Sequence, residues 1–210
     1  MAKHIVVHAQ NPQPRLIRLA AIALSEGKVI VCPTDTCYAL AALITDRPAQ
    51  DKIREIRRLH PDHPLTLLCR DLAQVGQYCH LDERAFSLLR RFLPGSYAFI
   101  LPSKKNIPRH ALSERKTIGV RISGHPVVAA LLDELGEPLV SSTLWMPEDD
   151  SPLTDPDDIF SRLKSLVGVV LDAGVLDNVP TTTVDLSGEV IRIVRVGKGD
   201  PAPFVSAKAT

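Results

Sequence analysis

Two kinds of apolar pattern alternate along the chain. Short apolar runs rich in β-branched residues predict strands, because such side chains suit a pleated, half-buried surface. The predicted strands cover residues 4–8, 29–32, 65–69, 97–101, 117–122, 138–142, 167–171, 181–186 and 190–196. Stretches with apolar residues three or four positions apart predict helices. The predicted helices cover residues 12–26, 46–58, 71–77, 82–93, 125–135 and 155–164.

Residues with special backbone chemistry set the expected ends of the first two helices. Asn11 is a plausible N-cap with Pro12 at the first helical position, and Gly27 closes that helix. Thr45 or Asp46 caps the second helix, since both residue types accept hydrogen bonds from free N–H groups.

The alternation of strands and helices predicts an α/β fold with a mixed sheet, in which the last two strands are antiparallel. No internal repeat and no Gly/Ser linker interrupts the chain. We therefore expect a single domain over residues 1–200. Residues 201–210 contain prolines and small side chains and are expected to form an extended or flexible tail.

Composition narrows the class of protein. The 210 residues are 45% apolar and 23% charged, with a net charge of +1, which argues against binding to nucleic acid through bulk charge alone. No apolar run reaches membrane-spanning length and the first residues lack the apolar core of a signal peptide, so we expect a cytoplasmic protein. The four cysteines form no CxxC pair, which favours free thiols over a metal site.

The stretch KVIVCPTDTCYAL at residues 28–40 is the first candidate for chemistry. Pro33 ends a buried strand because it has no N–H to donate. Thr34, Asp35 and Thr36 follow as three small side chains with oxygen atoms. Such residues bind either the backbone of their own turn or a ligand at the end of the strand, and both readings stay open.

Several familiar sites are absent from the sequence. There is no GxGxxG, no GxxxxGK[ST] and no GxSxG motif. His60 and His63 lie close together, but Pro61 and Pro64 break any helix that would align them. We interpret these histidines as loop residues and expect no metal site.

A basic run marks the end of the second helix. Such a run is either a solvated face or a site for the phosphates of a nucleotide or of RNA. Few aromatic residues are present, which disfavours a platform that stacks single-stranded bases and leaves double-stranded RNA or tRNA as the nucleic-acid alternative. The candidates for RNA contact are Lys52, Arg54 and Arg58.

Five short blocks in order resemble the YrdC/YciO-like family, the threonylcarbamoyl-AMP synthases and their relatives. That family carries PTET-x-YGL, PGP-x-T-x-x-L, VRIP-x-HP, PSTVVD and RPG. The matching blocks are PTDTCYAL at 33–40, PGSYAFIL at 94–101, IGVRISGHP at 118–126, PTTTVD at 180–185 and RVG at 195–197.

The resemblance implies a twisted α/β sheet around a large cavity that holds ATP, with Mg²⁺, and L-threonine. Threonine and bicarbonate would form a carbamate that attacks the α-phosphate of ATP and expels pyrophosphate. The product would pass to proteins that modify tRNA. No covalent nucleophile and no tightly bound cofactor are implied, because this chemistry needs positioned anions and neutralised phosphates.

The resemblance also assigns residues to the two ends of the cavity. The amino-acid end would be lined by Thr34, Arg121, Ser141 and Thr181. The nucleotide end would be lined by Arg57, Thr117, Ser142 and Arg195, with Arg57 and Arg195 stabilising charge.

Two departures from the family pattern weaken the expected synthase activity and resemble the YciO branch. The K-x-R pair reads Arg57-Arg58-Leu59, so the second cation is absent. The S-A-N-x-S-G loop reads STLWMP at 142–147. Three hypotheses follow: a synthase-like enzyme with weakened or altered activity, a double-stranded RNA or tRNA-binding protein, and an enzyme of different chemistry using the same cavity.

Overall fold

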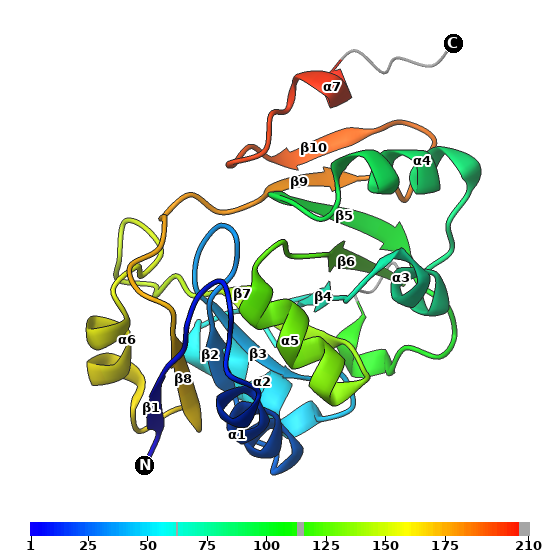
Figure 1. Ribbon diagram of the computed structural model, residues 1–210. Helices are drawn as coiled ribbons and strands as arrows, with labels where there is room; N and C mark the ends of the chain where they lie inside the picture. The colour runs from blue at the N-terminus through cyan, green and yellow to red at the C-terminus, as the bar shows by residue number, and fades with distance from the viewer. Residues whose placement is uncertain (62, 113–115, 206–210) are drawn as a thin grey trace.

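The computed structural model describes residues 1–61, 63–112 and 116–205. Within these residues ten strands form one sheet in the order β1-β8-β2-β3-β7-β4-β6-β5-β9-β10, with β1 and β10 at its two edges (Figure 1). The strands are β1 Lys3–Val6, β2 Ile30–Cys32, β3 Ala39–Leu43, β4 Thr66–Leu68, β5 Tyr97–Pro102, β6 Thr117–Arg121, β7 Leu139–Thr143, β8 Val169–Asp172, β9 Thr182–Asp185 and β10 Arg192–Arg195.

Seven α-helices and one short 3-10 helix (η1) accompany the sheet in the described part of the chain. They are α1 Pro14–Ser25, α2 Arg47–Ile56, α3 Leu72–Tyr78, α4 Glu83–Phe92, η1 Arg109–Ala111, α5 Pro126–Leu135, α6 Pro156–Leu163 and α7 Ala202–Val205.

The sheet is mixed, as the sequence predicted. β8 runs parallel to both of its neighbours, β1 and β2, and the pairs β4–β6 and β5–β9 are also parallel. The remaining pairs are antiparallel, including β9 with β10, which confirms the orientation expected for the last two strands.

Apolar side chains leave the sheet on both faces and form two cores. In β2 and the residue before it, Ile30 and Cys32 join the core under α1 and α5, whereas Val29 and Val31 join the core that includes α2, α4 and α6. α1 and α5 pack against each other in front of the sheet (Figure 1). Complete burial of one such aliphatic side chain contributes about 1.5–3 kcal/mol, so these alternating rows fix the register of the central strands.

Two local predictions were wrong. β3 was not predicted, because its sequence ALAAL lacks β-branched residues; it is a strand because it lies between β2 and β7 in the middle of the sheet. α1 begins at Pro14 rather than Pro12, since the His8 ring accepts hydrogen bonds from the N–H groups of Gln10 and Asn11 and holds a turn there.

The C-terminal segment differs from the extended tail that we expected from residue 201. Ala202–Val205 forms α7, and Phe204 is only 3% exposed. The Phe204 ring lies 4.8 Å from that of Phe92 and 5.7 Å from that of Tyr97, measured between ring centroids. This aromatic cluster holds α7 against α4 and β5; residues 206–210 lie outside the described residues.

Replacement of Phe204 should therefore destabilise the whole protein. We expect Phe204→Ala to lower the free energy of unfolding by about 3 kcal/mol, the lower end of the usual cost of a buried Phe→Ala change. The neighbouring Val205 is 66% exposed, so Val205→Ala should change it by less than about 0.5 kcal/mol. Urea unfolding measures both, and equal small effects would mean that the segment is not anchored.

Candidate functional site

A row of small side chains crosses the middle of the sheet on one face. Directly opposed residues of neighbouring strands point to the same side, and the register places the row on six adjacent strands. The small members are Ala39 on β3, Ser141 and Thr143 on β7, Thr66 on β4, Ala98 on β5 and Thr183 on β9, and the one large member is Arg121 on β6. These side chains line a cavity of about 140 Å³, which we call the central cavity.

Gly119 leaves room for the Thr66 side chain in this row. Gly119 pairs with Thr66, and a Cβ at Gly119 would lie 3.3 Å from the Thr66 hydroxyl oxygen. A larger side chain would force Thr66 to shift. The hollow thus depends on small residues in the strands.

Arg121 ends β6 with its guanidinium held on one side. Its Nη2 donates to Asp35 Oδ1 at 2.5 Å, to Thr36 Oγ1 at 2.8 Å and to Thr34 Oγ1 at 3.2 Å. Its Nε is buried without a hydrogen-bond partner among the described residues. The side chain is anchored through Nη2 and also lines the central cavity.

The Pro33–Cys37 turn supplies that anchor. Thr34 is 2% exposed, and its Oγ1 accepts hydrogen bonds from the N–H groups of Thr36 and Cys37 while donating to the Cys37 carbonyl. The sequence left open whether this turn binds its own backbone or a ligand. The hydrogen bonds of Thr34 match the first alternative. Thr34 lies behind Arg121 and does not line the cavity.

Arg195 reaches the cavity from the end of β10. Its Nε and Nη2 donate to the carbonyl and hydroxyl oxygens of Thr181, each at 3.0 Å. Just after it the chain passes close to the backbone of Pro180 and Thr181: a Cβ at Gly197 would lie 2.2 Å from the Pro180 carbonyl oxygen, so only glycine fits. Burial lowers the pKa of Arg195.

Arg57 is the C-cap of α2, whose N-cap is Asp46, one of the two predicted caps. Its Nη1 donates to the Thr143 carbonyl, and its Nε is buried without a partner among the described residues. Burial, followed by the neighbouring charge of Arg195, lowers the pKa of Arg57 to about 10. A half-buried cation with a buried, unpaired N–H and a like charge beside it is unfavourable in the absence of an anion.

The central cavity is therefore strongly cationic. Arg57, Arg121 and Arg195 all line it, and no Asp or Glu is among the described residues that do. His63 also lines it, and burial, with Arg57 and Arg54, lowers the pKa of His63, so its ring is neutral at pH 7. This arrangement is suited to an anion.

The structure brings together most of the residues that the family resemblance assigned. Those that line the central cavity are Arg57, Arg121, Ser141, Ser142, Thr181 and Arg195. Ser141 also donates to the Thr66 carbonyl. Thr117 does not line it: it begins β6, four residues before Arg121, and pairs with Pro102.

The cavity is smaller than the large one that we expected. Its volume of about 140 Å³ lies below the ~300–1,000 Å³ of most small-molecule pockets. Trp145 contributes to the lining, and its indole N–H donates to the Asp149 carbonyl at 2.9 Å. Leu144 and Met146 on either side are buried in the core. The altered loop at 142–147 was the only sequence signal for Trp145.

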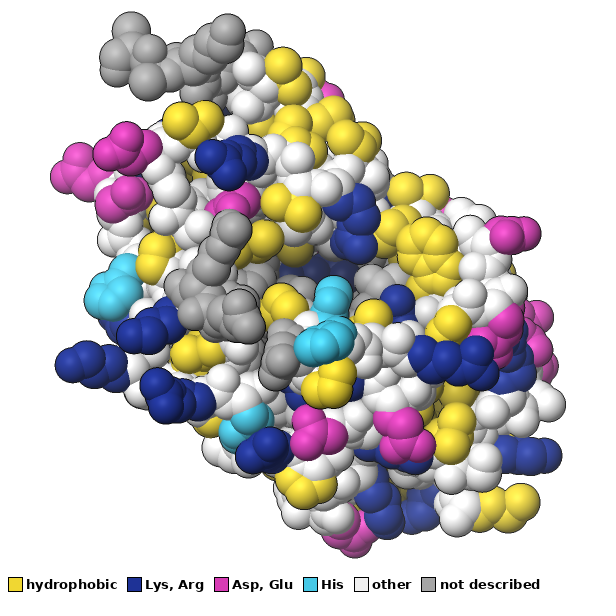
Figure 2. All heavy atoms as spheres, turned by 180° about the vertical axis from the view of Figure 1, so that it is seen from behind, with side chains coloured by type: hydrophobic (Ala, Val, Ile, Leu, Met, Phe, Trp, Pro, Cys, Tyr) yellow, Lys and Arg dark blue, Asp and Glu magenta, His cyan; other side chains and the backbone are white. Residues whose placement is uncertain are grey.

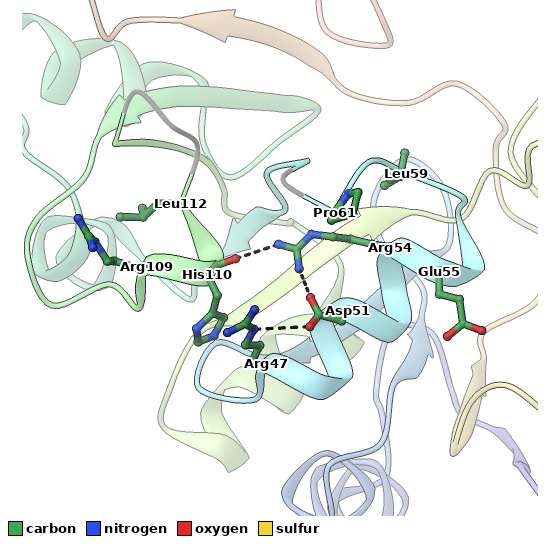
Figure 3. A pocket seen from close by; sticks show the side chains of 9 residues that line it. All are labelled: Arg47, Asp51, Arg54, Glu55, Leu59, Pro61, Arg109, His110 and Leu112. Carbon is green, nitrogen blue, oxygen red and sulfur yellow. Dashed lines mark hydrogen bonds and ion pairs between the residues drawn. The ribbon is translucent and has the colours of Figure 1, made fainter.

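Arg54, one of the three residues expected to contact RNA, is not at the surface. It is only 4% exposed, and its guanidinium donates to Asp51 Oδ1 and to the His110 carbonyl oxygen (Figure 3). It also donates to the His63 carbonyl oxygen. Leu59, where the family pattern has a cation, lines a separate pocket of about 460 Å³ beside Arg54 and not the central cavity. Arg54 is thus committed to holding α2, the following loop and η1 together.

The other two RNA candidates remain at the surface. Lys52 pairs with Glu55 at 3.1 Å, and Arg58 lies 3.8 Å from Glu148. On the face shown in Figure 2, some Lys and Arg side chains gather at the lower left, and others lie beside Asp and Glu. Because Lys52 and Arg58 each have a carboxylate neighbour, these two residues offer little net attraction to a phosphate backbone.

The described residues show neither a cluster of metal ligands nor a membrane-spanning helix. They contain no group of three or more His, Cys, Asp or Glu residues that could hold a metal ion. None of their helices has both the length and the apolar character needed to cross a membrane. The four cysteines are free and buried, and burial raises the pKa of each thiol.

Comparison with known proteins places this chain in a family. The family model Sua5/YciO/YrdC, whose description reads "telomere recombination", matches residues 22–197. The chain belongs to this family. It is 42% identical to the uncharacterized protein YciO of Escherichia coli K12 over 206 residues, covering 98% of this chain and 100% of YciO. The crystal structure of E. coli YciO has a TM-score of 0.94 at 41% identity, covering 97% of this chain and 100% of that one.

Threonylcarbamoyl-AMP synthases are more distant relatives. The Bacillus subtilis synthase is 29% identical over 191 residues, covering 88% of this chain and 54% of the synthase. The structure of Sua5 from P. abyssi complexed with L-threonine has a TM-score of 0.86 at 25% identity, covering 93% of this chain and 58% of Sua5. The chain thus spans a little over half the length of these two proteins. The family predicted from the five sequence blocks is confirmed.

If Arg57 is kept for an anion, its removal should not weaken the ligand-free protein. We expect Arg57→Met to raise the free energy of unfolding by about 1 kcal/mol, because an apolar side chain replaces a partly buried, uncompensated cation. Urea unfolding without added anions measures this. Arg58→Met is the matched control, since the Arg58 side chain is 74% exposed, and should change stability by less than about 0.5 kcal/mol. A loss of more than about 1 kcal/mol in Arg57→Met would mean that Arg57 serves the fold.

Proposed function

We propose that this protein binds a threonine-like amino acid and an adenine nucleotide, and carries out weakened or altered chemistry of the threonylcarbamoyl-AMP synthase type. The observation that carries the proposal is the convergence of Arg57, Arg121 and Arg195 on one cavity with no carboxylate among its described lining residues. Of the three cations only Arg121 is paired with a carboxylate, that of Asp35 outside the cavity, so the site favours a ligand with several negative charges.

The central cavity is large enough for an amino acid. About 140 Å³ is close to the ~150 Å³ of an engineered cavity that binds benzene, so a ligand with a handful of heavy atoms can be enclosed. Arg121 would receive the carboxylate, and the hydroxyls of Ser141 and Thr181 are available as polar neighbours. The L-threonine complex of the related P. abyssi Sua5 supports this assignment.

The nucleotide end lies toward Arg57 and Arg195. A nucleotide is too large for the enclosed volume, so we propose that only its phosphates reach the two guanidiniums while the remainder extends outside. Mg²⁺ would arrive with the nucleotide, because no described lining residue offers it a carboxylate. The nucleotide-binding assignment of Ser142 is retained in this proposal, and that of Thr117 is not.

The proposed reaction requires no group covalently attached to the protein. The threonine amine and bicarbonate combine to a carbamate with loss of water. A carbamate oxygen then bonds to the α-phosphorus of ATP while the bond from that phosphorus to the departing pyrophosphate breaks. Arg57 and Arg195 neutralise charge on the phosphates, which is the main service a protein supplies in such transfers. The absence of the S-A-N-x-S-G loop, whose place Trp145 and its neighbours take, would weaken this reaction.

Calorimetric titration tests binding, and pyrophosphate release tests turnover. We expect wild type to bind L-threonine, and Arg121→Ala to weaken that binding at least tenfold, since a charge-assisted contact contributes about 1.5–3 kcal/mol. Arg57→Met should weaken MgATP binding to a similar degree. Arg58→Ala, one residue away and exposed, should bind both like wild type.

The outcomes separate the hypotheses. Pyrophosphate released only with both threonine and bicarbonate would establish the synthase reaction. Binding without release would indicate different chemistry in the same cavity. If neither ligand binds at millimolar concentration, while duplex RNA or tRNA binds with a salt dependence that Lys52→Ala and Arg58→Ala reduce, the proposal is wrong and the protein is an RNA-binding one.

A further inference from the structure

Asp35 is the carboxylate nearest to the arginines of the central cavity, yet it does not line the cavity. It lies on the Pro33–Cys37 turn, half-buried, and its Oδ1 accepts from Arg121 Nη2 at 2.5 Å. Burial by itself raises the pKa of Asp35, but Arg121 and the hydrogen bond from Ser123 bring that pKa below its usual value. Asp35 is therefore ionised at neutral pH and pulls on Arg121 from the side away from the cavity.

Asp35 is itself held in place. Ser123 Oγ donates to Asp35 Oδ1 at 2.7 Å and accepts from the backbone N–H of His125 at 3.2 Å. His125 is the N-cap of α5, and its Nδ1 accepts from Val127 N. On the other side, Lys198 Nζ donates to the Asp35 carbonyl at 3.4 Å. Asp35 is thus tied through its carboxylate to the start of α5, and through its backbone carbonyl to the segment that follows Arg195.

These contacts determine which nitrogen of Arg121 is left for a ligand. Nη2 already donates to three acceptors on residues 34–36, and Nε is buried. Nη1 has no hydrogen bond to a described residue and is not among the buried unpaired atoms. Because a guanidinium is a rigid plane, fixing Nη2 fixes the direction of Nη1.

We propose that Asp35, oriented by Ser123, is a positioning residue that holds the Arg121 guanidinium so that Nη1 meets the carboxylate of an amino-acid ligand. The identity of that ligand rests on the proposed function, whereas the positioning of Arg121 does not. The result is selectivity for ligands that carry a carboxylate at this point.

The positioning can be measured without any ligand. In protein labelled with ¹⁵N-arginine, the Nε–H signal of Arg121, identified by its loss in Arg121→Ala, should show a high heteronuclear NOE in wild type. Asp35→Ala should lower that NOE, and Asp35→Glu should restore part of it because the longer carboxylate still reaches Nη2. Asp133→Asn is the matched control, since Asp133 is exposed and lies 3.7 Å from a different arginine, Arg70.

Selectivity is measured by titration with L-threonine and with L-threoninol, which lacks the carboxylate. We expect wild type to bind threonine at least tenfold more tightly than threoninol. Asp35→Ala should reduce this ratio of affinities by at least three-quarters, with little change in the affinity for threoninol. A purely structural role would weaken both ligands equally. In the Arg121→Ala background, Asp35→Ala should have no further effect on the preference.

The results separate the two claims. If wild type binds neither compound but the Arg121 NOE falls in Asp35→Ala, the proposed ligand is wrong and the positioning stands. If Asp35→Ala leaves both the NOE and the preference unchanged, the positioning is overturned. If urea unfolding shows that Asp35→Ala is not folded, the same measurements are made on Asp35→Asn. This change keeps the shape of the side chain and removes its charge.

Discussion

Mutual repulsion among three guanidinium groups is the constraint around which the site is built. Arg57, Arg121 and Arg195 share one small cavity. Burial lowers the pKa of Arg57 and of Arg195, and a neighbouring cation lowers each further: Arg195 acts on Arg57, and Arg121 acts on Arg195. The protein offsets only part of this cost, through Asp35 on Arg121 and through backbone carbonyls on the other two. Retaining an unfavourable arrangement of charge makes sense if an anion completes it.

The sheet makes that arrangement geometrically attainable. Neighbouring strands place alanine, serine and threonine in one row, and Gly119 avoids a clash within it. Arg121 ends β6 within this row, whereas Arg57 ends α2 and Arg195 ends β10 near the sheet edge. Because the three arginines come from distant parts of the chain, the fold itself, rather than any local motif, creates the site.

The sequence predicted the helices and strands better than it predicted which of their side chains form the site. Periodicity was sufficient for the mixed α/β sheet, but β3 was missed because alanines carry no strand signal, and α7 because the aromatic partners of Phe204 lie a hundred residues earlier. The basic run at 52–58 could not reveal that Arg54 is buried and Arg57 faces the cavity. The site residues came from family resemblance, and Asp35 and Trp145 acquired roles only once their contacts were known.

The most direct measurement is a crystal structure of the protein grown with L-threonine, Mg²⁺ and a non-hydrolysable ATP analogue. The account predicts a threonine carboxylate within about 3 Å of Arg121 Nη1 and phosphate oxygens at hydrogen-bonding distance from Arg57 and Arg195. Ligands bound in the pocket beside Arg54, with the three cavity arginines unchanged and in contact with water alone, would contradict it.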